Sequence, residues 1–255
     1  MILPEDPPGF VVRTELQKAA FENGFRLEHG IQSGWVRYGS TTVAGDIWLA
    51  GASMVGPWLL SIGQHEIAAE MKLESRRDDG PGSATFVFED LQGLYEGLDR
   101  AYRLSASLPD APLRQFRAET RTLPRGTEAE RLVVQRIGQN VFRDALTKYW
   151  NGRCPLSGIT DVQLLRASHI IPWAECETDF LRLDVHNGLL LSALWDAAFD
   201  SGRVSIGDDG SILRSPTLSP KAIAALGSTP SCLIGLTDAH RKNLIYHRRK
   251  HGFTV

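Results

Sequence analysis

The stretch RASHIIPWAE (166–175) places a single histidine, His169, inside a short apolar run that is interrupted by Pro172. From Leu165 to Ile171 the side chains alternate in the way that is typical of a β-strand. A proline cannot continue the hydrogen-bond ladder of a strand. The stretch therefore predicts a short strand with His169 near its end.

A second stretch, NGLLLSALWDAAFDSGRVSI (187–206), follows after an irregular acidic loop. Its segment 193–200 contains neither glycine nor proline and is compatible with a helix. Asp196 and Asp200 are four positions apart, so on a helix both carboxylates project from one face about one turn apart. Such carboxylates repel each other unless a cation lies between them, and oxygen donors suit Mg²⁺. The alternative is an ordinary solvent-facing helix surface.

The composition is that of a globular protein. With 255 residues, of which 42% are hydrophobic and 23% charged, the chain can bury the core of one large or two small domains. The N-terminal MILPEDPPGF has neither the basic start nor the apolar segment of a signal peptide, and no apolar run reaches the length of a membrane span. We therefore expect a cytoplasmic protein without a membrane partner.

The cysteines exclude two kinds of stabilising framework. Cys154, Cys176 and Cys232 are odd in number and widely spaced. A disulfide scaffold or a four-cysteine zinc site requires more cysteines at closer spacing. We expect free, partly buried thiols.

The N-terminal part of the sequence indicates a small α+β domain over residues 1–110. Helical patterns lie at 14–23, 65–71 and 91–108, and strand-like runs lie at 34–40, 46–51, 57–63 and 83–90. These elements predict an α+β fold class.

The rest of the chain is predicted to form a second domain. Residues 111–125 are polar and interrupted by prolines, which predicts a linker. Thr127 and Glu130 then have the spacing of a capping box at the start of a long helix. We expect the second domain to span residues 126–255.

Charge is distributed unevenly along the chain. Residues 1–120 carry 17 Asp and Glu against 11 Lys and Arg, whereas residues 121–255 carry 13 against 17. The C-terminal segment 239–252 is especially basic and predicts a helix capped by Thr237 or Asp238. Its candidate phosphate-binding residues are Arg241, Lys242, Arg248, Arg249 and Lys250. A solvated basic helix end is the alternative.

The strand histidine, the loop with Asn187 and the helix with two aspartates together resemble the ββα-metal fold of HNH endonucleases. The resemblance covers roughly residues 148–207. Four segments are similar to those of the bacterial subgroup without zinc-binding cysteine pairs. They are CPLSGI (154–159), SHIIPW (168–173), NGLLLS (187–192) and AFDSGRVSI (198–206). The resemblance implies a C-terminal ββα-metal nuclease domain with flanking helices.

The resemblance also implies roles for individual residues. His169 corresponds to the general base, and Asn187 corresponds to the residue that fixes the loop over it. Asp196 lies nine positions after Asn187, where the family has a metal ligand, and Asp200 corresponds to a second helical ligand. Ser168 occupies a position where many members have Asp or His, so it is the weakest of the three candidate ligands.

The activity implied is hydrolysis of phosphodiester bonds in double-stranded DNA with Mg²⁺, Mn²⁺ being the alternative ion. By analogy with restriction enzymes of this layout, we expect a defence role, a homodimer and an N-terminal domain that recognises DNA. Its aromatic residues Trp35, Tyr38, Trp48 and Trp58 either stack on a flipped-out, modified base or belong to the core. The alternative function is a DNA-binding module with a catalytically impaired HNH scaffold, which the serine at position 168 favours.

Overall fold

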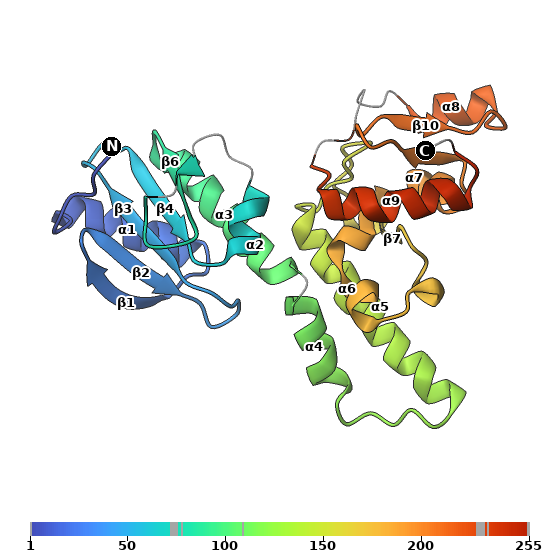
Figure 1. The fold of residues 1–255 in the computed structure, drawn as a ribbon, viewed down its shortest axis with the longest axis horizontal. Helices are drawn as coiled ribbons and strands as arrows, with labels where there is room; N and C mark the ends of the chain where they lie inside the picture. Colours follow the sequence, from blue (N-terminus) through green and yellow to red (C-terminus); the bar gives the residue numbers. More distant parts are fainter. Residues whose placement is uncertain are drawn as a thin grey trace. The chain divides into compact units, whose positions relative to one another are not determined.

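The computed structural model describes residues 2–71, 76–77, 79–108, 110–227, 233 and 235–253. The chain divides into two compact units, Met1–Ala111 and Pro112–Val255 (Figure 1). Both units combine helices with antiparallel strands, which confirms the predicted α+β class. Within the described residues, no helix is long and apolar enough to cross a membrane.

The first unit is built on an antiparallel sheet. Among the described residues the strand order is β1-β2-β3-β4-β6-β5. The strands are β1 (Leu27–Gln32), β2 (Trp35–Gly39), β3 (Ile47–Gly51), β4 (Trp58–Ile62), β5 (Arg76–Arg77) and β6 (Ala84–Phe88). Val36 lies opposite Leu49, Leu49 opposite Leu60, and Leu60 opposite Phe86, and all four are fully buried. This row forms the centre of the sheet's core face.

Helices α1 (Phe10–Glu22), α2 (His65–Met71) and α3 (Leu91–Ser107) pack against this sheet. Asp90 caps α3 by accepting a hydrogen bond from Gly93 N at 2.8 Å. A Cβ at Gly97 would lie 2.4 Å from Phe88 Cζ, so the glycine lets α3 approach the end of β6 closely. Strand β1 was not predicted, because most of its side chains are exposed and do not alternate.

Residues 110–120, where the sequence suggested an interrupted linker, instead form helix α4 (Asp110–Thr120). Pro112 is tolerated because it lies in the first turn, where backbone N–H groups have no helical partner. Leu113 and Phe116 are buried, which gives the helix an apolar face. Only the segment that follows Thr120, up to the next helix, is irregular.

In the second unit α4 is followed by helix α5 (Glu128–Tyr149), whose predicted capping box is confirmed. Thr127 N donates to Glu130 Oε2 at 2.9 Å, and Glu130 N donates to Thr127 Oγ1 at 3.2 Å. Val141, Phe142 and Ala145 are buried. Helix α5 thereby presents an apolar surface to a hairpin of two strands.

That hairpin pairs β7 (Leu165–His169) with β8 (Gly188–Ser192). Helix α7 (Ala193–Asp200) follows β8 directly and contacts both strands. The remaining elements are α6 (Asp179–Leu183), β9 (Val204–Ile206), β10 (Ile212–Arg214), α8 (Pro220–Leu226), α9 (Asp238–Lys250) and the 3₁₀ turns Val162–Leu164, Trp173–Glu175 and Val185–Asn187. The predicted strand at 165–169 and helix at 193–200 are thus confirmed.

Two of the three cysteines can be described. Cys154 and Cys176 are buried free thiols, as expected. Cys232 lies outside the described residues.

Candidate active site

The pairing of β7 with β8 brings together two residues that are far apart in sequence. His169 lies opposite Gly188 in the register, so Asn187 comes immediately before the hairpin position that faces the histidine. A Cβ at Gly188 would lie 2.5 Å from Phe142 Cζ. The glycine therefore leaves room for the Phe142 ring, which stacks on the imidazole of His169 with centroids 3.8 Å apart.

The imidazole of His169 is held in one orientation. Its Nε2 lies 2.9 Å from the carbonyl oxygen of Arg182. A carbonyl can only accept, so Nε2 carries the proton and Nδ1 of the neutral ring is an acceptor. The Trp173 ring meets the imidazole edge to face at 5.6 Å. Burial lowers the pKa of His169, which keeps the ring neutral at pH 7.

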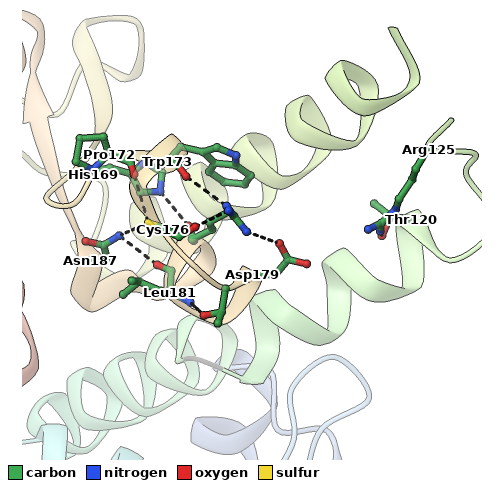
Figure 2. A network of polar contacts seen from close by, with 11 residues as sticks. Thr120, Arg125, His169, Pro172, Trp173, Cys176, Asp179, Leu181 and Asn187 are labelled. Atoms are coloured by element: carbon green, nitrogen blue, oxygen red, sulfur yellow. Dashed lines mark hydrogen bonds and ion pairs between the residues drawn. The ribbon is translucent and has the colours of Figure 1, made fainter. Parts of the chain in front are cut away.

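Asn187 is fully buried and binds the loop that follows β7. Its Oδ1 accepts from Ile171 N at 2.8 Å, and its Nδ2 donates to Ile171 O at 3.2 Å and to Leu181 O at 3.1 Å. Nδ2 also donates to Cys176 Sγ at 3.3 Å. Figure 2 shows Asn187 directed toward Cys176 and Leu181. One side chain thus joins the start and the end of the loop 170–181.

Arg182, which the sequence did not single out, holds the same loop from its other side. Its guanidinium donates to the backbone oxygens of Trp173 and Cys176 and to Asp179 Oδ1, the last at 3.0 Å. Figure 2 shows Trp173, Cys176 and Asp179 gathered in this network. Since the partner of His169 is the backbone carbonyl of Arg182, no residue type at position 182 could have indicated it.

Ser168, Asp196 and Asp200 form a small oxygen-rich group. Ser168 is buried, and its hydroxyl donates to Asp200 Oδ1 at 3.1 Å. Burial raises the pKa of the Asp196 carboxyl, and the charge of Asp200 raises it further, whereas a hydrogen bond with Ser168 acts in the opposite direction. Burial likewise raises the pKa of Asp200. The structure therefore brings the three predicted ligands together.

This group fits a hard divalent cation. No cluster of three or more His, Cys, Asp or Glu side chains suited to a metal occurs in the part of the chain that the structure describes. Mg²⁺, however, usually keeps several waters and takes only one or two protein carboxylates. A cation would also offset the burial that raises both carboxyl pKa values and the charge of Asp200 that raises the pKa of Asp196 further.

A cavity of about 350 Å³ opens beside these residues. Its walls include Ser168 and His169 from β7, Asp200 from the last position of α7, and Lys250 and His251 from the end of α9. Asp196 is one turn earlier on α7 and does not line the cavity. The cavity thus places a neutral imidazole, a carboxylate and an ammonium group around one space.

The basic residues of α9 do not share one environment. The helix begins at Asp238 with Thr237 as its N-cap. Arg248, expected on the exposed basic face, is instead 2% exposed. Its Nη1 donates to Ile206 O at 2.8 Å, and its Nη2 pairs with Asp208 Oδ1 at 2.6 Å. Helical geometry turns this arginine toward β9, so it stabilises the fold and cannot contact DNA from there.

The other four basic candidates remain accessible to different degrees. Lys242 and Arg249 are exposed. Arg241 is half-buried and donates to Asp208 O at 2.8 Å and Asp238 Oδ1 at 3.0 Å. Lys250 pairs with Glu175, a residue of the loop after β7.

The aromatic residues of the first unit divide into two groups. Tyr38 and Trp58 are buried in the core, which leaves no face for a base. Trp35 and Trp48 are half-buried. The guanidinium carbon of Arg37 lies 5.7 Å from the centroid of the Trp48 ring.

Comparison with known families supports the chemistry that this geometry suggests. Residues 154–207 match the HNH endonuclease family. The matched HNH segment contains β7, the loop pinned by Asn187, β8, α7 and β9. It indicates a nuclease, whose substrate would be DNA, and HNH nucleases generally use divalent metal ions. No curated protein matches the chain.

Proposed function

We propose that the protein is a metal-dependent DNA endonuclease with its active site in the cavity between β7, α7 and α9. The observation that carries the proposal is the fixed tautomer of His169, which leaves Nδ1 as an acceptor. The His169 ring lines the same cavity as Asp200. A neutral imidazole in this position is suited to take a proton from a water molecule.

In the proposed reaction, His169 Nδ1 accepts the proton of the water that attacks the phosphorus. Asn187 and Arg182 act indirectly, because they hold the loop that leads into α6, and the Arg182 carbonyl in α6 orients the imidazole. Asp196, Asp200 and Ser168 would hold a divalent ion, which we propose to be Mg²⁺ with Mn²⁺ as the alternative, since both suit an all-oxygen donor set. When bound, the ion stabilises charge on the phosphate oxygens and on the leaving 3′ oxygen.

DNA binding by the proposed enzyme uses phosphate contacts from α9. Lys242 and Arg249 are exposed cations of this helix that do not line the cavity, and their contacts carry no sequence information. Binding through them weakens as salt rises, because phosphate-bound counterions are released on association.

The first unit is proposed to recognise the DNA, in keeping with a restriction or defence role. Trp35 and Trp48 are the two aromatics of the predicted set that keep exposed surface, so they are the candidates for stacking on a flipped-out or modified base. Cutting both strands requires two active sites, and we propose a homodimer. Light scattering on and off DNA tests this, and a strict monomer in both conditions would contradict it.

The experiment that tests the enzyme is cleavage of unmodified and cytosine-modified plasmid DNA with Mg²⁺, Mn²⁺ or EDTA. His169→Ala is run beside the wild type, with His65→Ala, an exposed histidine of α2, as the matched control. We expect metal-dependent cutting that is lost only in His169→Ala. Intact DNA binding without cutting by the wild type would instead support the alternative, a binding module on an impaired HNH scaffold.

A further inference from the structure

Lys250 differs from the other basic residues of α9 because it lines the cavity that contains His169 and Asp200. Lys242 and Arg249 have no place in that lining. The side chain of Lys250 is 35% exposed, so its ammonium group is neither enclosed in the core nor free in solvent. Among the described residues that line the cavity, Lys250 is the only lysine or arginine. A cation at the wall of a proposed phosphodiesterase site requires an anionic partner.

In the structure that partner is Glu175, in the 3₁₀ turn Trp173–Glu175 after β7. Lys250 Nζ and the Tyr246 hydroxyl both donate to its carboxylate. The hydrogen bond from Lys250, followed by that from Tyr246, lowers the pKa of Glu175, so it is a carboxylate at neutral pH. Both members of the ion pair are more than a third exposed, and ion pairs of this kind contribute little net stability. Another anion can therefore replace Glu175 at little cost.

We propose that Lys250 binds the scissile phosphodiester in the cavity, exchanging the Glu175 carboxylate for a phosphate oxygen when DNA enters. The inference rests on the proposed nuclease function and assigns a substrate contact beyond the residues matched to the family, which end at residue 207. The Lys250 ammonium offsets the charge that grows on the phosphate oxygens as water attacks. Glu175 holds the side chain at the cavity until then.

The competing explanation is that Lys250 merely fastens α9 to the loop after β7 through Glu175. The two explanations separate when either member of the pair is changed. Glu175→Gln breaks the ion pair but leaves the ammonium group, whereas Lys250→Met removes the ammonium group. A fastening role predicts equal losses of activity from both changes, and phosphate binding predicts a much larger loss from Lys250→Met than from Glu175→Gln.

The test measures single-turnover cleavage at saturating DNA for wild type, Lys250→Met, Lys250→Arg, Glu175→Gln and the charge-matched control Lys221→Met, an exposed residue of α8. We expect Lys250→Met to lower the rate roughly 100-fold, as removal of one preorganised charge-stabilising group does. Lys250→Arg should recover part of that loss, and Glu175→Gln and Lys221→Met should lose far less. Equal losses in Lys250→Met and Glu175→Gln would overturn the proposal.

A second measurement does not depend on cleavage. The lysines of His169→Ala protein are acetylated with and without a short DNA duplex in EDTA, and the modified residues are identified by mass spectrometry. We expect DNA to protect Lys250 but not Lys221. Unchanged acetylation of Lys250 with DNA bound would overturn the phosphate contact, whereas protection of Lys250 in a protein whose wild type cuts no DNA would overturn only the nuclease function.

Discussion

Two histidines in the second unit have nearly the same surroundings but differ in whether a ring nitrogen is left to accept a proton. His169 stacks on Phe142 with centroids 3.8 Å apart, and His247 stacks on Phe199 at 3.9 Å. Each ring places Nε2 near a backbone carbonyl, at 2.9 Å from Arg182 O and 3.1 Å from Phe199 O. Burial lowers the pKa of both.

The difference lies in the other nitrogen. Nδ1 of His247 is bonded to the buried hydroxyl of Ser205 at 2.9 Å. Both nitrogens of that ring are therefore used within the protein, and the residue is structural. For His169 the described residues supply a partner only to Nε2, which leaves Nδ1 able to accept a proton from a substrate water. Burial and stacking alone therefore do not distinguish a structural histidine from a candidate base.

The largest effect is expected from truncating each ring in turn. His169→Ala should lower the cleavage rate by about 10²- to 10⁴-fold, the usual contribution of a general base, and should cost less stability than His247→Ala because His169 is only half-buried. His247→Ala should instead lower the free energy of unfolding by on the order of 2–4 kcal/mol, because a buried ring is lost and Ser205 loses its partner. Cleavage kinetics and urea unfolding of both variants check this. The comparison fails if His247→Ala, while folded, is as inactive as His169→Ala.

Lowering the pH should reduce the free energy of unfolding through His247, the structural histidine. Burial lowers the pKa of His247 to about 4, from the ordinary value of 6.5. Between these values the unfolded chain binds a proton that the folded protein does not. The contribution of neutral His247 to the free energy of unfolding is therefore fully present above pH 6.5. It falls by about 3 kcal/mol as the pH drops toward 4. Urea unfolding at pH 7 and pH 4 should show a smaller loss in His247→Gln than in wild type, and equal losses would contradict the assignment.

A change at Asn187 tests the comparison further. Asn187 holds the loop that leads to Arg182, whose backbone carbonyl is the hydrogen-bond partner of His169. Asn187→Ala should leave Ile171 N and two backbone carbonyls without their side-chain partner, at a cost of about 2–3 kcal/mol in unfolding free energy. Cleavage should fall as well. The control is Asn140→Ala, an exposed residue of α5. Equal stability of the two variants would show that Asn187 does not pin the loop.

The smallest effect is expected for Arg182→Lys, which keeps the backbone carbonyl but loses the planar guanidinium. A loosened loop should lower kcat roughly tenfold through misplacement of His169, with little change in KM. It should also expose the imidazole, so its pKa rises toward 6.5 and the acidic limb of the kcat/KM profile moves to higher pH. An unchanged profile would assign Arg182 a role in stability alone.

The elements predicted most closely are those with local signals. The capping box of Thr127 and Glu130, the strand ending at His169 and the helix 193–200 are all encoded within a few residues of where they form. Helix α4 and strand β1 escaped prediction for opposite reasons. Pro112 suggested a break that the first helical turn accommodates, and β1 is exposed, so it carries no apolar alternation.

The sequence placed His169, Asn187, Asp196 and Asp200 in one motif through its resemblance to HNH endonucleases, which depends on residue types and spacings that are local properties of the chain. Only the tertiary structure decided which carbonyl fixes the imidazole, which nitrogen is left to accept a proton, and which basic residues of α9 face the cavity. Arg248 and Lys250 are two positions apart and equally basic in sequence, yet one is buried against β9 and the other lines the proposed site. The physical reason is that helix packing, which depends on distant residues, determines the direction in which each side chain points.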